Sequence, residues 1–159
     1  MTDNTSQIPS IMTAWLWSST SGGLQNNLRK SDTAHRPGQT LRPHQCLIRI
    51  LSSSLNPADY KVPEDTPSLL WKCVVSMPAS PGMDFSGQVV ATGANVTNVR
   101  IGQRVFGSLP LPRQFGSLAE HSVADAGLVV PVPEGVSADD AATVGVAGQT
   151  ALQVIKGKV

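Results

Sequence analysis

Glycine and proline interrupt this chain so often that no long helix fits between them. The 159 residues include 14 glycines and 12 prolines, and the apolar runs that separate them are short. Short apolar runs bounded by turn residues are typical of strands, and glycine and proline mark the turns. The pattern predicts a β-rich fold with abundant loops, in a chain long enough for one domain with a core.

Alternating apolar residues locate the expected strands. In the stretch CLIRILSSSLN, Cys46, Ile48 and Ile50 fall on one face, so this segment is expected to be a strand with at least one buried face. Gly102 is expected at a tight corner between two strands. Further strands are expected within residues 12–19, 24–32, 84–93, 94–107, 115–125 and 127–133.

Helical signals are few, and the two longest follow the strands. Asn56 and Pro57 suit the start of a short helix, whereas residues 62–81, with four prolines, are expected to form an irregular loop. Ser137 is an expected N-cap, and a second helix is expected from residue 148 onward. Because strands do not alternate with helices, we predict a mainly β fold, a small and partly open β-barrel with short helices, rather than a doubly wound sheet.

The charge balance excludes several classes of partner. The formal net charge is +1, there is no basic run, and aromatic residues make up only 4% of the chain. Nucleic acid and anionic membrane surfaces both require a basic patch, so neither is an expected partner. The N-terminus lacks a signal peptide pattern, and a cytoplasmic location is expected.

Residues able to hold a metal are scarce. A zinc site needs several Cys, His or carboxylate ligands brought together. No C-x-x-C or H-x-x-x-H pair occurs among the available nitrogen and sulfur donors, which are His35, His44, His121, Cys46 and Cys73. We expect no bound metal, and we expect both cysteines to be buried free thiols because their neighbours are apolar.

Asp84 stands out in the stretch PGMDFSGQVV. It fits a metal ligand, a catalytic carboxylate or the polar start of a strand, and its local pattern does not decide among them. Phosphate-binding glycine motifs and the G-x-S-x-G motif of hydrolases are absent from the chain.

Four motifs in a fixed order go further than composition. They are SLNPADYK, PGMDFSGQVVATGANVTNVRIGQRVFG, GSLAEHSVAD and PVPEGVSADDAATVGVAGQTAL. With this order and spacing the sequence resembles the medium-chain dehydrogenase/reductase superfamily, and within it the zinc-independent quinone oxidoreductases and fungal trans-enoyl reductases. Residues 1–11 are polar and are expected to form a disordered tail. From residue 12 onward, the resemblance implies a GroES-like catalytic domain at 12–145, and at 146–159 a C-terminal helix that begins a truncated Rossmann domain.

The same resemblance implies an activity. Such reductases pass hydride from NADPH to an enone, a quinone or an enoyl thioester, and the fungal members suggest a role in secondary metabolism. Because only the catalytic domain is expected here, we predict that the chain alone is inactive and that its apolar C-terminal segment self-associates. A non-catalytic GroES-like binding module is the alternative.

Site residues also follow from the resemblance. It implies that Lys61 and Tyr60 are catalytic and that Asn56, Asp59 and Thr150 bind the cofactor, with Thr150 near the nicotinamide. From the residues alone, the same positions also fit local architecture, such as a helix cap and its first turn.

The resemblance also bears on Asp84. Zinc-dependent members carry Gly-His-Glu where this chain has Gly82, Met83 and Asp84, and a thioether is a poor zinc ligand. This implies that no metal is bound, and that Asp84 is structural, tying the start of its strand to a neighbouring backbone or basic group.

Overall fold

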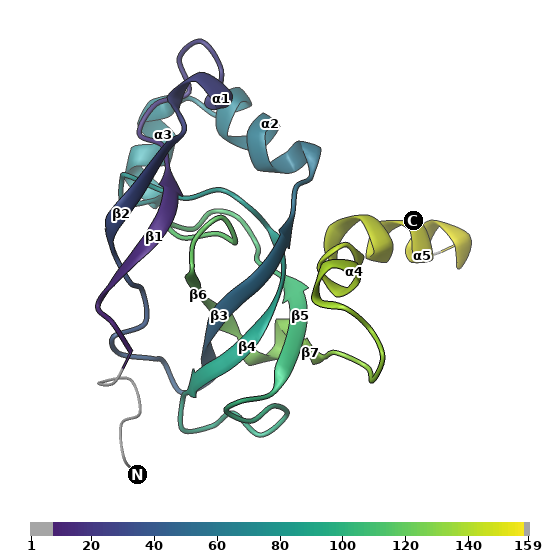
Figure 1. The fold of residues 1–159 in the computed structure, drawn as a ribbon. Coiled ribbons are helices and arrows are strands. Elements are labelled where there is room, and N and C mark those ends of the chain that lie inside the picture. The colour runs from purple at the N-terminus through teal and green to yellow at the C-terminus, as the bar shows by residue number, and fades with distance from the viewer. Residues whose placement is uncertain (1–7, 158–159) are drawn as a thin grey trace.

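The computed structural model describes residues 8–157 as a mainly β fold (Figure 1). A five-stranded antiparallel sheet has the order β6-β3-β4-β5-β7, and β1 and β2 form a separate two-stranded sheet. Neither sheet closes on itself, so the predicted partly open architecture is confirmed. The strands are β1 (Ile11–Leu16), β2 (Arg29–His35), β3 (Gln45–Ser54), β4 (Asp84–Thr92), β5 (Arg104–Ser108), β6 (His121–Asp125) and β7 (Val129–Pro131).

The core lies on one face of the five-stranded sheet. Phe85 and Val89 of β4 are fully buried and pack with Ile48 of β3 and Val105 of β5. These residues alternate along their strands, as the sequence pattern predicts. Gly102 forms the turn between β4 and β5 with φ +85°, a conformation that side chains rarely adopt, so the predicted tight corner is confirmed.

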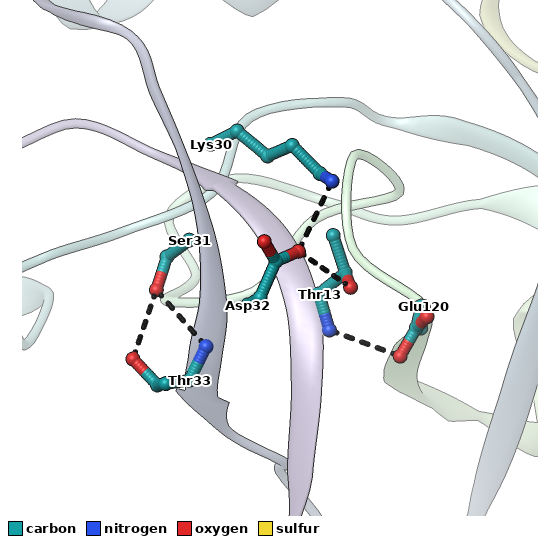
Figure 2. Close-up of polar contacts among 6 residues, drawn as sticks. All are labelled: Thr13, Lys30, Ser31, Asp32, Thr33 and Glu120. Carbon is teal, nitrogen blue, oxygen red and sulfur yellow. Dashed lines mark hydrogen bonds and ion pairs between the residues drawn. The ribbon is translucent and has the colours of Figure 1, made fainter.

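The two-stranded sheet is attached through polar contacts at β1 (Figure 2). The backbone N–H of Thr13 donates to Glu120 Oε2 at 2.9 Å, and the N–H of Glu120 donates back to the Thr13 carbonyl. The Thr13 hydroxyl lies 3.0 Å from Asp32 Oδ1, which also pairs with Lys30 at 3.1 Å. Because the two Thr13–Glu120 hydrogen bonds join β1 to the segment before β6, they hold the small sheet against the larger one, whereas the Asp32 contacts lie within the small sheet.

Two expectations about the first half of the chain are wrong. The expected strand at 24–32 begins instead as a short helix, α1 (Leu24–Asn27), and only then continues as β2. The expected loop at 62–81 contains the end of α2 (Pro57–Asp65) and all of α3 (Ser68–Val74). Packing explains α3: Trp71 is buried against Trp17, with ring centroids 5.8 Å apart and planes at 88°.

The two cysteines differ in solvent exposure. Cys46 is buried in the core as expected, and burial raises the pKa of its thiol to about 11. Cys73 is exposed on α3, so the expectation that it is buried is wrong. Both are free thiols. The face of α3 that carries Trp71 is the buried one, and apolar sequence neighbours did not distinguish the two faces.

The C-terminal part is helical. Ser137 caps α4 (Ala138–Ala142) by accepting a hydrogen bond from the Asp140 N–H, as predicted. A π-helical turn at Val144–Gly148 leads into α5 (Gln149–Ile155), which projects from the side of the barrel (Figure 1). Within residues 8–157, no helix combines the length and the apolar character needed to cross a membrane. Residues 1–7 of the predicted tail lie outside the described residues, and Ile11 already belongs to β1.

We predict that α5 causes self-association. Its Leu152, Val154 and Ile155 side chains are 52%, 60% and 82% exposed. Each large apolar side chain left in water forgoes about 1.5–3 kcal/mol of burial. Sedimentation velocity is expected to show concentration-dependent dimers or larger species, and Ile155→Glu is expected to reduce them. A monodisperse monomer with slow amide exchange across residues 146–157 contradicts this prediction.

Candidate functional site

An apolar pocket lies between α1 and the start of α2. Its volume is about 300 Å³. Leucine and proline side chains make most of its wall, and polar groups enter from α2 and α1. The lining residues are Leu24, Gln25, Leu28, Leu55, Asn56, Asp59, Tyr60, Pro81 and Leu118. An apolar pocket with a few convergent polar groups is the usual form of a small-molecule site.

Local sequence explains why α2 begins at this pocket. Pro57 occupies the first helical position, where its missing N–H costs nothing. The Asn56 N–H donates to Asp59 Oδ2 at 2.6 Å, and the Asp59 N–H donates to the Asn56 carbonyl at 2.9 Å. Glu64, further along α2, accepts a hydrogen bond of 2.6 Å from the Leu24 N–H. This bond joins α1 to α2 and so fixes the two walls of the pocket relative to each other.

Asp59 is a buried acid at the pocket wall. It is only 5% exposed. Burial raises the pKa of its carboxyl above the ordinary value, and nearby Asp84 adds to the rise, whereas the backbone N–H groups of Asn56, Met83 and Gly82 partly oppose it. Asp59 therefore retains its proton to a higher pH than an exposed aspartate does.

Asp84 joins three segments behind the pocket residue Asn56. It is fully buried at the first position of β4. Its Oδ2 accepts hydrogen bonds from Asn56 Nδ2 at 3.0 Å and from the Val146 N–H at 2.8 Å. A side chain on Gly145 would collide with Asp84 Oδ1, so only glycine fits there. The prediction that Asp84 ties the start of its strand to a neighbouring backbone is confirmed, and the tie reaches the segment before α5.

The structure brings three of the five predicted site residues together. Asn56, Asp59 and Tyr60 line the pocket, and Tyr60 is 44% exposed. Lys61 is exposed on α2 and does not line it. Thr150 lies on α5, where its hydroxyl donates to the Val146 carbonyl at 2.7 Å. The catalytic and cofactor-binding roles given to these residues remain predictions.

Sequence reasoning missed the apolar walls. Leu24 and Leu28 lie in a segment expected to be a strand, which would place them away from α2. Leu55, Pro81 and Leu118 come from three loops or strand ends that only the tertiary fold brings together. The one available signal is that Leu55 immediately precedes the Asn56–Pro57 helix start.

We predict that the purified protein contains no stoichiometric zinc. Among residues 8–157, no group of three or more His, Cys, Asp or Glu side chains is placed to hold a metal ion. Met83, which the resemblance aligns with a histidine of zinc-dependent members, offers only a thioether, which binds zinc poorly. Elemental analysis is expected to find far less than one zinc per chain. About one zinc per chain that survives a chelator would refute the prediction.

Known proteins resemble both the sequence and the fold. The family model of the alcohol dehydrogenase GroES-like domain matches residues 42–134. Trans-enoyl reductase pgmF of Aspergillus terreus is 40% identical over 157 residues, which cover 94% of this chain and 44% of the reductase. The quinone oxidoreductase of Coxiella burnetii superposes with a TM-score of 0.79 at 32% identity, covering 92% of this chain and 45% of that one.

A mycobacterial structure complexed with NADPH also matches. Its TM-score is 0.71 at 25% identity, and the match covers 91% of this chain and 40% of the mycobacterial chain. This chain therefore spans less than half the length of the relatives that it matches.

Proposed function

Because the chain belongs to the alcohol dehydrogenase GroES-like family, within the medium-chain dehydrogenase/reductase superfamily, we propose that it is the substrate-binding part of an NADPH-dependent reductase. The proposed reaction reduces a C=C bond next to a carbonyl, as in an enone, a quinone or an enoyl thioester. The names of the relatives support a reductase of this kind. Secondary metabolism is the proposed setting, as the resemblance of the motifs to fungal trans-enoyl reductases suggests.

The pocket between α1 and α2 carries the proposal. Its leucine and proline wall suits the aliphatic part of an enoyl or enone substrate, because burying that part releases about 25 cal/mol per Å². Three of its four polar residues, Asn56, Asp59 and Tyr60, come from the start of α2, and the fourth, Gln25, comes from α1. A substrate that packs its chain on the leucines presents its carbonyl to these polar groups. The pocket therefore orients the substrate as well as binding it.

Residues of the first turn of α2 are assigned roles in this arrangement. We assign to the Tyr60 hydroxyl the hydrogen bond to the substrate carbonyl oxygen, where negative charge develops during reduction. Lys61 is exposed beside Tyr60. We assign to it either the stabilisation of that negative charge or the binding of a cofactor phosphate. Asn56 and Asp59 are assigned to cofactor binding, and Asp84 holds the Asn56 amide in place.

The cofactor side of the site is only partly built by this chain. A bound NADPH supplies the hydride. The Thr150 hydroxyl donates a hydrogen bond to the Val146 carbonyl. Its oxygen can therefore still accept a hydrogen bond from the nicotinamide carboxamide. Thr150 therefore fits the nicotinamide end of the cofactor. Pyrophosphate is held in this superfamily by a glycine-rich turn at a helix N-terminus, and no such motif occurs in these 159 residues.

We predict that the 159-residue chain neither binds NADPH tightly nor turns over. A few polar contacts at the nicotinamide do not offset the several kcal/mol needed to immobilise a flexible dinucleotide. Calorimetric titration is expected to show no micromolar binding. A chimera with the part of the mycobacterial relative that this chain does not cover, taken from the protein solved with NADPH, is expected to bind NADPH and to reduce a trans-2-enoyl thioester.

Both parts of this experiment can fail separately. Micromolar NADPH binding by the isolated chain would show that the cofactor contacts are wrongly placed. A folded chimera that binds NADPH but reduces no enone, quinone or enoyl thioester would refute the proposed function.

A further inference from the structure

A second cavity, lined mainly by polar groups, lies at the opposite end of β3 from the apolar pocket. Gln45 begins β3 at this cavity, whereas Asn56 follows the other end of the strand, roughly 30 Å away at the usual rise per residue. The cavity volume is about 430 Å³. Its lining residues are Pro37, Arg42, Gln45, Pro112, Arg113, Gln114, Phe115, Val123 and Asp125.

Arg113 is held in the cavity wall by backbone carbonyls. Its Nε donates to the Pro110 carbonyl at 3.0 Å, and its Nη1 donates to the Val123 carbonyl at 2.6 Å. The guanidinium is partly buried, and burial lowers its pKa. A guanidinium carries five N–H donors, so these two bonds leave most of its hydrogen-bonding capacity unused. Two carbonyl anchors fix its orientation without neutralising its charge.

No carboxylate pairs with this charge in the described part of the chain. Within residues 8–157 the one ion pair is between Lys30 and Asp32, on the small sheet. Asp125 lines the same cavity and acts on Arg113 through space, yet it lies beyond ion-pair distance. Partly buried charges are usually paired, because removing them from water is costly. An anion is therefore expected to gain the most binding free energy beside an incompletely paired guanidinium at a polar cavity.

Arg42 adds a second cation to the cavity. Its backbone N–H donates to Gln45 Oε1 at 3.1 Å, which fixes the side-chain amide of Gln45 beside it. No hydrogen bond or ion pair among the described residues engages the Arg42 guanidinium. Two guanidinium groups and one carboxylate give the lining a net charge of +1.

We propose that this cavity binds a small oxyanion, a phosphate or a carboxylate group, between Arg113 and Arg42. Planar guanidinium groups match the two oxygens of such an anion, and charge-assisted hydrogen bonds of this kind are the strong ones. Gln45 contributes an amide donor. Asp125 opposes the anion and so limits its affinity. The site is separate from the proposed reductase pocket and does not depend on that function.

Titration of the 159-residue chain followed by amide NMR tests the proposal. Inorganic phosphate and acetate are added separately at pH 7, with sodium chloride adjusted to hold the ionic strength constant. Saturable shifts are expected for amides of residues 113–115 and 123–125. Arg42→Gln is expected to weaken binding about tenfold, and Asp125→Asn to tighten it about threefold. Arg29→Gln is the matched control, because Arg29 is exposed at the start of β2 and Pro37 of the cavity lies beyond the other end of that strand. It is expected to change nothing.

Arg113 itself is left intact in this test because it anchors two backbone carbonyls. Tighter binding of phosphate than acetate identifies a phosphate-bearing ligand, and the reverse order identifies a carboxylate. Shifts that grow without saturation for both anions overturn the proposal. Saturable shifts that are the same in Arg42→Gln and Asp125→Asn as in the unmodified chain also overturn it.

Discussion

Asp84→Ala is expected to lower the free energy of unfolding by about 3 kcal/mol. The substitution leaves the buried Asn56 Nδ2 and the partly buried Val146 N–H without their acceptor. Each unsatisfied buried donor costs about 1–3 kcal/mol. Since a domain is stable by only about 5–15 kcal/mol, this is a large fraction of the total. Urea unfolding followed by tryptophan fluorescence measures the change.

Asp84→Asn separates hydrogen bonding from simple loss of the side chain. Both hydrogen bonds go to the same carboxylate oxygen, Oδ2, and an amide oxygen in that position keeps both. The loss of the charge, together with an amide N–H placed at the buried Oδ1 position that has no partner, is expected to cost about 1–2 kcal/mol, less than Asp84→Ala. Equal destabilisation by Asp84→Asn and Asp84→Ala would show that the two hydrogen bonds do not explain the effect.

A substitution at Gly145 tests the close packing of Gly145 against Asp84. Gly145→Ala is expected to destabilise the protein because the new Cβ collides with Asp84 Oδ1. In an Asp84→Ala background the obstacle is gone, so the same substitution is expected to cost less. Gly127→Ala is the matched control, because a Cβ there has no atom within 4 Å. Additive effects of Asp84→Ala and Gly145→Ala would contradict the contact.

The second large effect concerns the pocket wall. Leu55→Glu is expected to lower kcat/KM for an aliphatic enoyl thioester at least about tenfold, measured in the NADPH-binding chimera. Burying a leucine against a substrate chain contributes about 1.5–3 kcal/mol, and a carboxylate in the same place must also be desolvated. Leu55 lines the pocket yet is 65% exposed, so the substitution is not expected to disturb folding.

The sequence predicted the elements whose residues carry a local pattern. Alternation located β3 and β4, a positive φ requirement located the Gly102 turn, and a serine followed by acids located the start of α4. Each of these signals is contained within a few neighbouring residues. Alternation therefore sufficed for the mainly β, partly open fold.

Features that depend on distant residues were not predictable in this way. Residues 24–27 are helical where Leu24 is bonded to Glu64, and α3 forms where Trp71 packs on Trp17. These long-range contacts override weak local preferences. The residues of the candidate site likewise fall into a locally predictable group and a group that depends on the tertiary fold. Asn56, Asp59 and Tyr60 lie within one local motif, whereas the leucine walls converge only through the fold.

The most direct test of the proposed function compares kcat/KM for trans-2-octenoyl thioester reduction in three forms of the chimera. They are the unmodified form, Leu55→Glu and the matched control Leu51→Glu, which changes an exposed leucine of β3 that does not line the pocket. The proposal predicts NADPH-dependent reduction that Leu55→Glu lowers at least about tenfold and Leu51→Glu leaves unchanged, with equal NADPH affinity in all three. Equal kcat/KM in the three forms, or no reduction by a chimera that binds NADPH, would contradict it.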